Sequence, residues 1–269
     1  MDAAVPAPSS RRPARGWTIV GEQELRDLWL GGRGLLLGVA FSVLLSIIAY
    51  LTATNQALNF LEQRESVNLT LQVAIAVGSL LALLAAADAV SGERERSTLE
   101  SLLLAPVSRL GITSGKLIAA LSLWAAAFVI TIPYVWFLGR GVGIAGHALV
   151  TGLVVGTLLA VSLAALGILV SVFAQSNRLS LSVSLFLLLA LFAPTQLPST
   201  ALNGWAGDLL VRLNPITAGE HYVGTIVVDG HPWRDDVFWL TSPIVAAVVL
   251  STAAVLSGRF LRLGGGAHQ

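Results

Sequence analysis

The sequence predicts an all-α membrane protein with six transmembrane helices, and three observations support this fold class. Hydrophobic residues make up 55% of the 269-residue chain and charged residues only 12%, about half the share of a soluble domain. Six apolar stretches have about 20 residues or more, the length that a helix needs to cross the hydrocarbon of a membrane. Lipid offers backbone amides no hydrogen-bond partner, so each stretch must be helical.

Residues 1–16, rich in Pro, Ser, Ala and Arg, predict a disordered cytoplasmic tail. Residues 17–34 alternate apolar and charged side chains, which predicts an amphipathic helix in the membrane interface, bending into the first span at Gly31-Gly32. The membrane domain is expected over 35–263, followed by a cytoplasmic tail at 264–269. Its spans are predicted near 35–54, 69–90, 112–138, 148–174, 179–197 and 239–260, with a connecting segment at 91–111 and an outer loop at 198–238.

The positive charges are distributed unequally between the two sides of the predicted bundle. Cytoplasmic loops of membrane proteins carry an excess of Lys and Arg, so both termini are expected to be cytoplasmic. One side receives Arg11, Arg12, Arg15, Arg26, Arg33, Arg94, Arg96, Arg109, Lys116, Arg178, Arg259 and Arg262, whereas the other receives Arg64, Arg140, Arg212 and Arg234.

The segment between the second and third spans predicts a short helix at the cytoplasmic face. Ser97 followed by Glu100 matches a capping box at a helix start, and Pro106 disfavours helical geometry beyond Ala105. Leu99 and Leu103 fall on one side, together with Leu102. A helix this short needs an apolar contact, because isolated helices under about 12 residues are marginal in water. That contact is either the bundle's own base or a groove on a partner protein.

Glu93-Arg-Glu-Arg-Ser-Thr-Leu-Glu-Ser-Leu-Leu-Leu-Ala-Pro-Val-Ser-Arg109, followed by Gly115-Lys116, resembles the pattern of the type-2 (ABC-2) ATP-binding-cassette transporter permeases. The six spans, the interfacial helix and the long outer loop agree with the same family. Residues 214–239 also resemble the outer segment of the branch that contains gliding-motility and copper-site-maturation permeases. One departure is Ser97, where the family frequently has Gly.

The resemblance implies a permease subunit in a bacterial inner membrane, paired with a second permease copy or a paralogue. Its cytoplasmic helix would dock on two separate ABC ATPase subunits, which would bind ATP and Mg, so the chain itself would hold no cofactor. The residues that the resemblance assigns to this ATPase-coupling element are Glu93, Thr98, Leu99, Glu100, Leu103, Pro106 and Arg109.

Several features argue against an enzyme or a nucleic-acid partner. Gly111 to Lys116 has three residues between its glycines, where a phosphate-binding loop has four, and Leu117 replaces the magnesium-binding Ser or Thr. Lys116 is interpreted instead as an anchor that reaches the membrane surface. The four histidines lack paired metal-ligand spacing, there is no cysteine, and the net charge is only +1. No catalytic, cofactor or metal site is therefore predicted.

Small polar residues on two spans are candidates for the translocation path. The resemblance implies that the second and fifth spans line the route between subunits, and interhelical hydrogen bonding is the alternative role. In the outer loop, the spacing of Trp205, Leu209 and Leu213 predicts an amphipathic helix ended by Asn214-Pro215, and a second apolar stretch runs over 222–228. The path candidates are Gln72, Ala76, Ser79, Ser180 and Ser184.

These features together predict a permease that exports a lipid-like or amphiphilic substrate with ATP hydrolysed by a separate subunit. One alternative is a non-transporting mechanotransmission or anchor subunit driven by the same kind of ATPase. An ion-coupled secondary transporter is a further alternative, disfavoured because Asp88, near the cytoplasmic end of the second span, is the only acidic residue within the apolar stretches.

Overall fold

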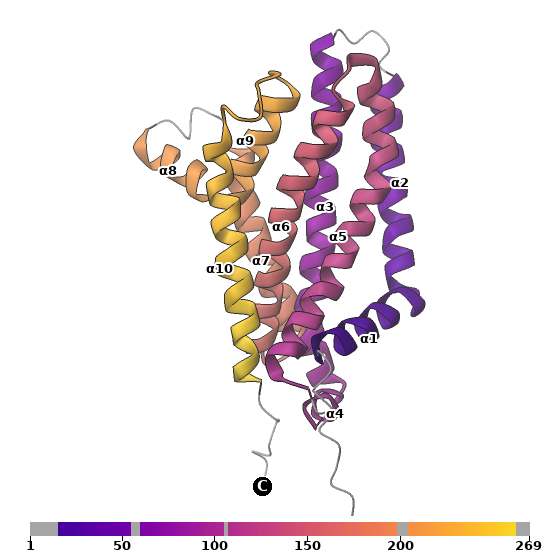
Figure 1. The fold of residues 1–269 in the computed structure, drawn as a ribbon, viewed down its shortest axis with the longest axis vertical. Helices are drawn as coiled ribbons and strands as arrows, with labels where there is room; N and C mark the ends of the chain where they lie inside the picture. Colours follow the sequence, from indigo (N-terminus) through magenta and orange to yellow (C-terminus); the bar gives the residue numbers. More distant parts are fainter. Residues whose placement is uncertain (1–15, 55–59, 105–106, 198–203, 262–269) are drawn as a thin grey trace, which may run out of the picture.

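The computed structural model describes residues 16–54, 60–104, 107–197 and 204–261. This described part of the chain is helical and contains no strand, and six of its helices are long and apolar enough to cross a membrane. The predicted fold class is therefore confirmed. The six spans pack lengthwise against one another in an elongated bundle, and the short helices lie at its two ends (Figure 1).

The first span is α2 (Arg33–Thr54), and the next three are the long helices α3 (Phe60–Glu95), α5 (Arg109–Gly139) and α6 (Ala145–Phe173). The fifth is α7 (Asn177–Phe192), extended by the 3-10 turn η2 (Ala193–Gln196). The sixth is α10 (Thr241–Ser257), flanked by the turns η4 (Val237–Leu240) and η5 (Gly258–Phe260). The remaining elements are α1 (Gly16–Leu30), α4 (Leu99–Leu104), α8 (Trp205–Leu213), α9 (Pro215–Val227) and the turn η1 (Arg140–Val142).

Helix α3 differs most from its predicted span at 69–90. Its 36 residues span about 54 Å at 1.5 Å per residue, well beyond the hydrocarbon thickness of about 30 Å. The helix therefore continues through Glu93 and Glu95, which the sequence placed in a separate connecting segment. Helical geometry continues there because the backbone has internal partners, whatever the polarity of its side chains.

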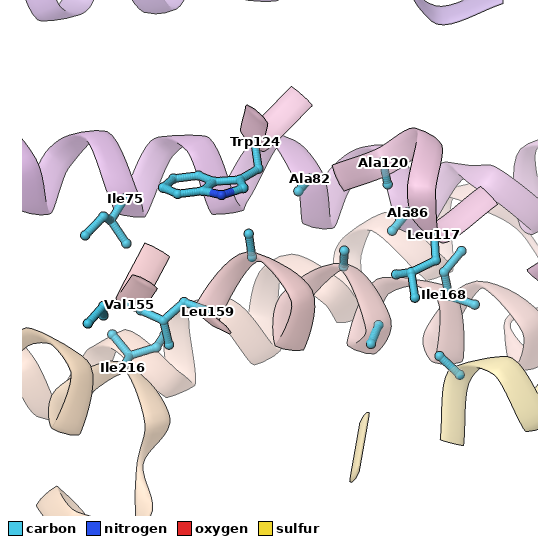
Figure 2. Packing of buried hydrophobic residues seen from close by; sticks show 14 of the residues in the cluster. Ile75, Ala82, Ala86, Leu117, Ala120, Trp124, Val155, Leu159, Ile168 and Ile216 are labelled. Carbon is cyan, nitrogen blue, oxygen red and sulfur yellow. The ribbon is translucent and has the colours of Figure 1, made fainter. Parts of the chain in front are cut away.

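The core lies between α3, α5 and α6, where a large aromatic ring faces two glycines. Trp124 of α5 is 4% exposed, and its indole nitrogen donates a hydrogen bond to Thr157 at 3.1 Å. A Cβ on Gly78 of α3 would lie 2.8 Å from this ring, and a Cβ on Gly156 of α6 would also overlap it. Figure 2 shows Trp124 beside Ile75 and above Val155 and Leu159. These glycines thus let the three central spans approach closely.

Helix α1 lies across one end of the bundle, next to α4 (Figure 1). It packs on α5 where Gly21 meets Gly115: a Cβ on Gly115 would lie 2.9 Å from the backbone nitrogen of Gly21. Only glycine permits this approach. The C-terminal end of α10 lies at the same end of the bundle, which is called the cytoplasmic end below, following the predicted orientation.

The outer segment contains two helices. Helix α8 lies where the apolar spacing predicted an amphipathic helix, and most of the apolar stretch at 222–228, for which no helix was predicted, belongs to α9. Helix α8 ends at Leu213, and Asn214 caps α9 by accepting hydrogen bonds from the backbone nitrogens of Ile216 and Thr217. Pro215 occupies the first turn, where its missing N–H leaves no bond unmade. Ile216 and Val223 are buried, so α9 inserts into the bundle, whereas Trp205 of α8 remains 81% exposed.

Candidate functional site

The cytoplasmic end of α3 closes with a Schellman motif instead of leading into a capping box. The backbone nitrogen of Thr98 donates to the carbonyl of Glu93 at 3.0 Å, and that of Ser97 donates to the carbonyl of Arg94 at 3.2 Å. Ser97 adopts φ +59°, a left-handed conformation that favours glycine. The prediction that Ser97 caps α4 is therefore wrong, because the residue terminates the preceding helix.

Helix α4 has one inward and one outward face. Leu99 is 4% exposed and Leu103 is half-buried against the same hydrophobic core, whereas Leu104 is 78% exposed and Glu100 also faces outward. Of the two contacts considered for the leucines, the bundle's own base is the one that Leu99 and Leu103 make. A partner would meet the opposite face.

The chain re-enters the bundle through a capped turn at α5. Ser108 has an extended backbone, and its hydroxyl accepts a hydrogen bond from the backbone nitrogen of Gly111 at 3.1 Å. Arg109 follows directly and is exposed, as is Thr98 at the other end of α4. These two coupling candidates therefore lie on the surface beside α4, whereas Pro106 lies outside the described residues.

A buried lysine joins three helices beneath this surface. Lys116 of α5 is 1% exposed, and its ammonium donates hydrogen bonds to Glu24 of α1 and, at 2.7 Å, to Glu93 of α3. The interpretation of Lys116 as a surface-reaching anchor is wrong, because two carboxylates compensate its charge inside the protein. Glu93, assigned to the coupling element, points inward to this lysine. We call Glu24, Glu93 and Lys116 the lysine clamp.

A second polar group lies nearby on α3. The Asp88 carboxylate accepts a hydrogen bond from the Asn177 amide at 2.7 Å and faces the guanidinium groups of Arg96 at 3.5 Å and Arg33 at 3.8 Å. These contacts connect the ends of α2, α3 and α7. The two guanidinium groups thus balance the negative charge of Asp88 at the cytoplasmic end of α3.

Both polar groups border a cavity of about 840 Å³ between α1, α2, α3 and α5. Leucine side chains from α2, α3 and α5 form its apolar part, and the charged residues gather toward the cytoplasmic end of α3. The sequence did not predict this cavity, because it is formed by segments as distant as α1 and α5. The apolar lining includes Leu37, Leu81, Leu84 and Leu123.

The five path candidates fall into two groups. Ser180 of α7 donates a hydrogen bond to the carbonyl of Ala87 in α3 at 2.7 Å, and Ser79 bonds within its own helix at 2.6 Å. Ser184 is fully buried, and no partner for its hydroxyl occurs among the described residues. All three serines are buried, and among them Ser180 makes the interhelical hydrogen bond that was the alternative role considered for these candidates.

Gln72 and Ala76 instead border a narrow space in the outer half of the bundle. The space measures about 10 Å³, room for roughly one water molecule, and Glu220 of α9 faces it. Burial raises the pKa of Glu220 to about 7. Glu220 was not among the residues predicted from the sequence, although an acidic residue within the apolar run 215–227 was the available signal. Across the described ranges, no group of three or more His, Asp or Glu residues is arranged to hold a metal ion.

Comparison with protein families matches residues 18–256 to the model described as "ABC-2 family transporter protein". The match covers the interfacial helix, all six spans and the outer segment. No curated protein matches the sequence. The family match does not distinguish branches, so the similarity of residues 214–239 to gliding-motility and copper-site-maturation permeases remains a prediction.

Proposed function

Because this chain belongs to the ABC-2 family of transporter proteins, we propose that it exports an amphiphilic molecule with energy from ATP hydrolysed on separate subunits. It is a multi-pass membrane permease subunit of an ABC transporter, a class that works with ABC ATPases. In the proposed assembly, two ATPases bind ATP and Mg, and a second permease copy or paralogue completes the path in a bacterial inner membrane. Both termini lie on the side of the ATPases.

The observation that carries this proposal is the connection between α4 and the spans. Leu99 holds α4 against the bundle, while Glu100 and Leu104 face outward beside it. The Schellman motif and the Ser108 cap close the turns on either side of α4. A partner that displaces the outward face would therefore move the ends of α3 and α5.

The lysine clamp extends this connection to α1. Its ammonium contacts carboxylates on α1 and α3, so a displacement of α5 is opposed by two ionic contacts with neighbouring helices. Coupling of ATP hydrolysis to transport requires that the partner contact the two conformations differently. The lysine clamp joins α1 to the cytoplasmic ends of α3 and α5, so a force that the partner applies at these ends would reach the spans.

The mechanotransmission alternative is supported by the outer end. Helix α8 leaves Trp205 81% exposed and Leu213 67% exposed, and Phe238 of η4 is 86% exposed. Such an apolar surface suits either the lipid interface or an outer protein partner. Transport measurements separate the two functions, because only an exporter changes the distribution of a cargo across a sealed membrane.

The experiment is reconstitution of the chain with its ATPase in sealed vesicles that contain fluorescent amphiphiles. We expect ATP-dependent movement of an amphiphile, and we expect Glu100→Ala to lower transport per ATP hydrolysed at least about fivefold, since its side chain lies on the docking face. Glu65→Ala, an exposed glutamate at the outer end of α3, is the matched control and should transport normally. Normal coupling in Glu100→Ala would contradict its assigned role, and an unchanged distribution of every amphiphile would favour mechanotransmission.

A further inference from the structure

We infer that the cavity between α1, α2, α3 and α5 binds the headgroup of a membrane phospholipid that carries both a phosphate and a primary ammonium. This inference goes beyond the proposed export, because the bound lipid need not be the cargo. It rests on the shape of the cavity and on two groups of charges that line it.

The cavity has the layered polarity of a lipid. Along α3 its lining runs from Leu81 to Glu93, a rise of about 18 Å. Leu81 and Leu84 line the part of the cavity that lies deeper in the membrane. Asp88, Glu93 and Arg96 line the part nearer the cytoplasmic end. A volume of about 840 Å³ accommodates a headgroup together with the first part of its chains. The apolar part thus suits acyl chains, and the charged part suits a headgroup at the membrane surface.

The first group of charges has an excess of positive charge. Asp88 faces both Arg33 and Arg96, at 3.8 and 3.5 Å, so one carboxylate is shared by two guanidinium groups. Both arginine side chains are at least half exposed, which leaves donors available to a ligand. Guanidinium groups pair with phosphate through parallel hydrogen bonds. This group therefore suits a lipid phosphate.

The second group of charges, the lysine clamp, has an excess of negative charge. One ammonium is shared by the carboxylates of Glu24 and Glu93, and Asp27 of α1 adds another acidic residue to the lining. The Oε1 atom of Glu93 accepts from Lys116, but its Oε2 atom is buried without a hydrogen-bond partner in the described structure. That oxygen is closed to solvent, so the carboxylates open to a ligand ammonium are those of Glu24, which is 27% exposed, and of Asp27 on the surface.

The two groups together distinguish among common headgroups. An ethanolamine headgroup has a phosphate for the arginines and an N–H donor for the acidic group. A choline headgroup has the same charges, but its quaternary nitrogen has no hydrogen to donate. A glycerol headgroup keeps the phosphate and lacks the cation. The cavity should therefore prefer phosphatidylethanolamine to phosphatidylcholine and to phosphatidylglycerol.

The test is native mass spectrometry of the delipidated, purified chain, titrated with these three lipids carrying identical oleoyl chains. We expect one phosphatidylethanolamine per chain to bind at roughly tenfold lower concentration than either other lipid, the ratio expected from one charge-assisted hydrogen bond. Arg96→Gln should weaken the binding of all three lipids several-fold, because each carries the phosphate. Asp27→Asn should reduce the preference for phosphatidylethanolamine several-fold, because it removes an acceptor from the acidic group. Both residues lie at the rim, so the variants leave the lysine clamp intact.

The control is Arg26→Gln, which removes a charge on α1, the helix of Asp27, at an exposed residue outside the cavity. It should keep the wild-type preference. Equal binding of the three lipids would overturn the inference, and so would an affinity unaffected by Arg96→Gln together with a preference unaffected by Asp27→Asn. A dimer that excludes lipid and dissociates in the rim variants would likewise overturn it, since a second copy would then occupy the cavity. Because the readout is binding, a negative result leaves the transport experiment above unaffected.

Discussion

Replacing Lys116 by Met removes the buried ammonium that joins α1, α3 and α5. Methionine keeps the length of the side chain, so the packing beside Gly115 changes little. The carboxylates of Glu24 and Glu93 then lose their cation and face each other's negative charge. The lysine clamp therefore makes a specific prediction about folding stability.

The size of the effect follows from the burial of the three groups. The Lys116 side chain is 0% exposed, whereas those of Glu24 and Glu93 are 27% and 19% exposed. Removing one partner of a fully buried ion pair costs about 3–5 kcal/mol. The partial exposure of the glutamates lets water relieve some of this penalty, so we expect a loss of about 3 kcal/mol. At about 2–4 °C per kcal/mol, the transition temperature should fall by about 6–12 °C.

The assay is thermal unfolding in detergent, followed by the intrinsic fluorescence of the seven tryptophans. Arg26→Met, which breaks an exposed ion pair on α1, is the matched control and should cost less than about 0.5 kcal/mol. The triple variant Glu24→Gln, Lys116→Met, Glu93→Gln should recover most of the loss, because it leaves no buried charge unpaired. A Lys116→Met protein as stable as the wild type would refute the role of the lysine clamp in stability.

The remaining predictions concern three other positions. Ser97→Gly should stabilise the protein by about 0.5–1 kcal/mol, since glycine adopts the left-handed conformation without steric cost; an unchanged or lower transition temperature would contradict the Schellman geometry. Gly115→Ala should cost about 1–3 kcal/mol, because its Cβ would press on Gly21, and the fluorescence assay measures it. Glu220→Gln should flatten the pH dependence of stability. The folded wild type keeps a proton between pH 4.5 and about 7 that the unfolded chain has released, so its stability falls as pH rises through this window. The variant should therefore gain on the wild type, by of order 2 kcal/mol, between unfolding measured at pH 5 and at pH 8.

Hydropathy sufficed to predict the six spans, because the membrane imposes one requirement on every crossing segment. The same signal did not predict where α3 ends, since a helix may leave the bilayer while its backbone stays internally bonded. The sequence around Ser97 fits either a helix start or a helix end. The backbone hydrogen bond from Thr98 to Glu93 shows that this sequence forms a helix end, and the pattern of side chains alone does not reveal that bond.

The residues that sequence reasoning missed acquire their roles from distant partners. Lys116 and Glu24 are separated by more than 90 residues, and nothing local marks them as a pair. The same holds for Glu220, which borders the same space as Gln72 only because α9 inserts into the bundle. By contrast, the outward position of Glu100 depends only on the register of one short helix, and its assignment to the coupling element stays a prediction.

The measurement that tests the central claim most directly is disulfide crosslinking between α4 and the ATPase in membranes that contain both proteins. The chain has no cysteine, so a single Cys can be placed at Leu104, which faces outward, or at Leu99, which is buried. A Cys engineered at the surface of the ATPase should crosslink to position 104 and not to position 99. Failure of position 104, and of position 100 beside it, to crosslink in a folded and inserted protein would contradict docking through this face.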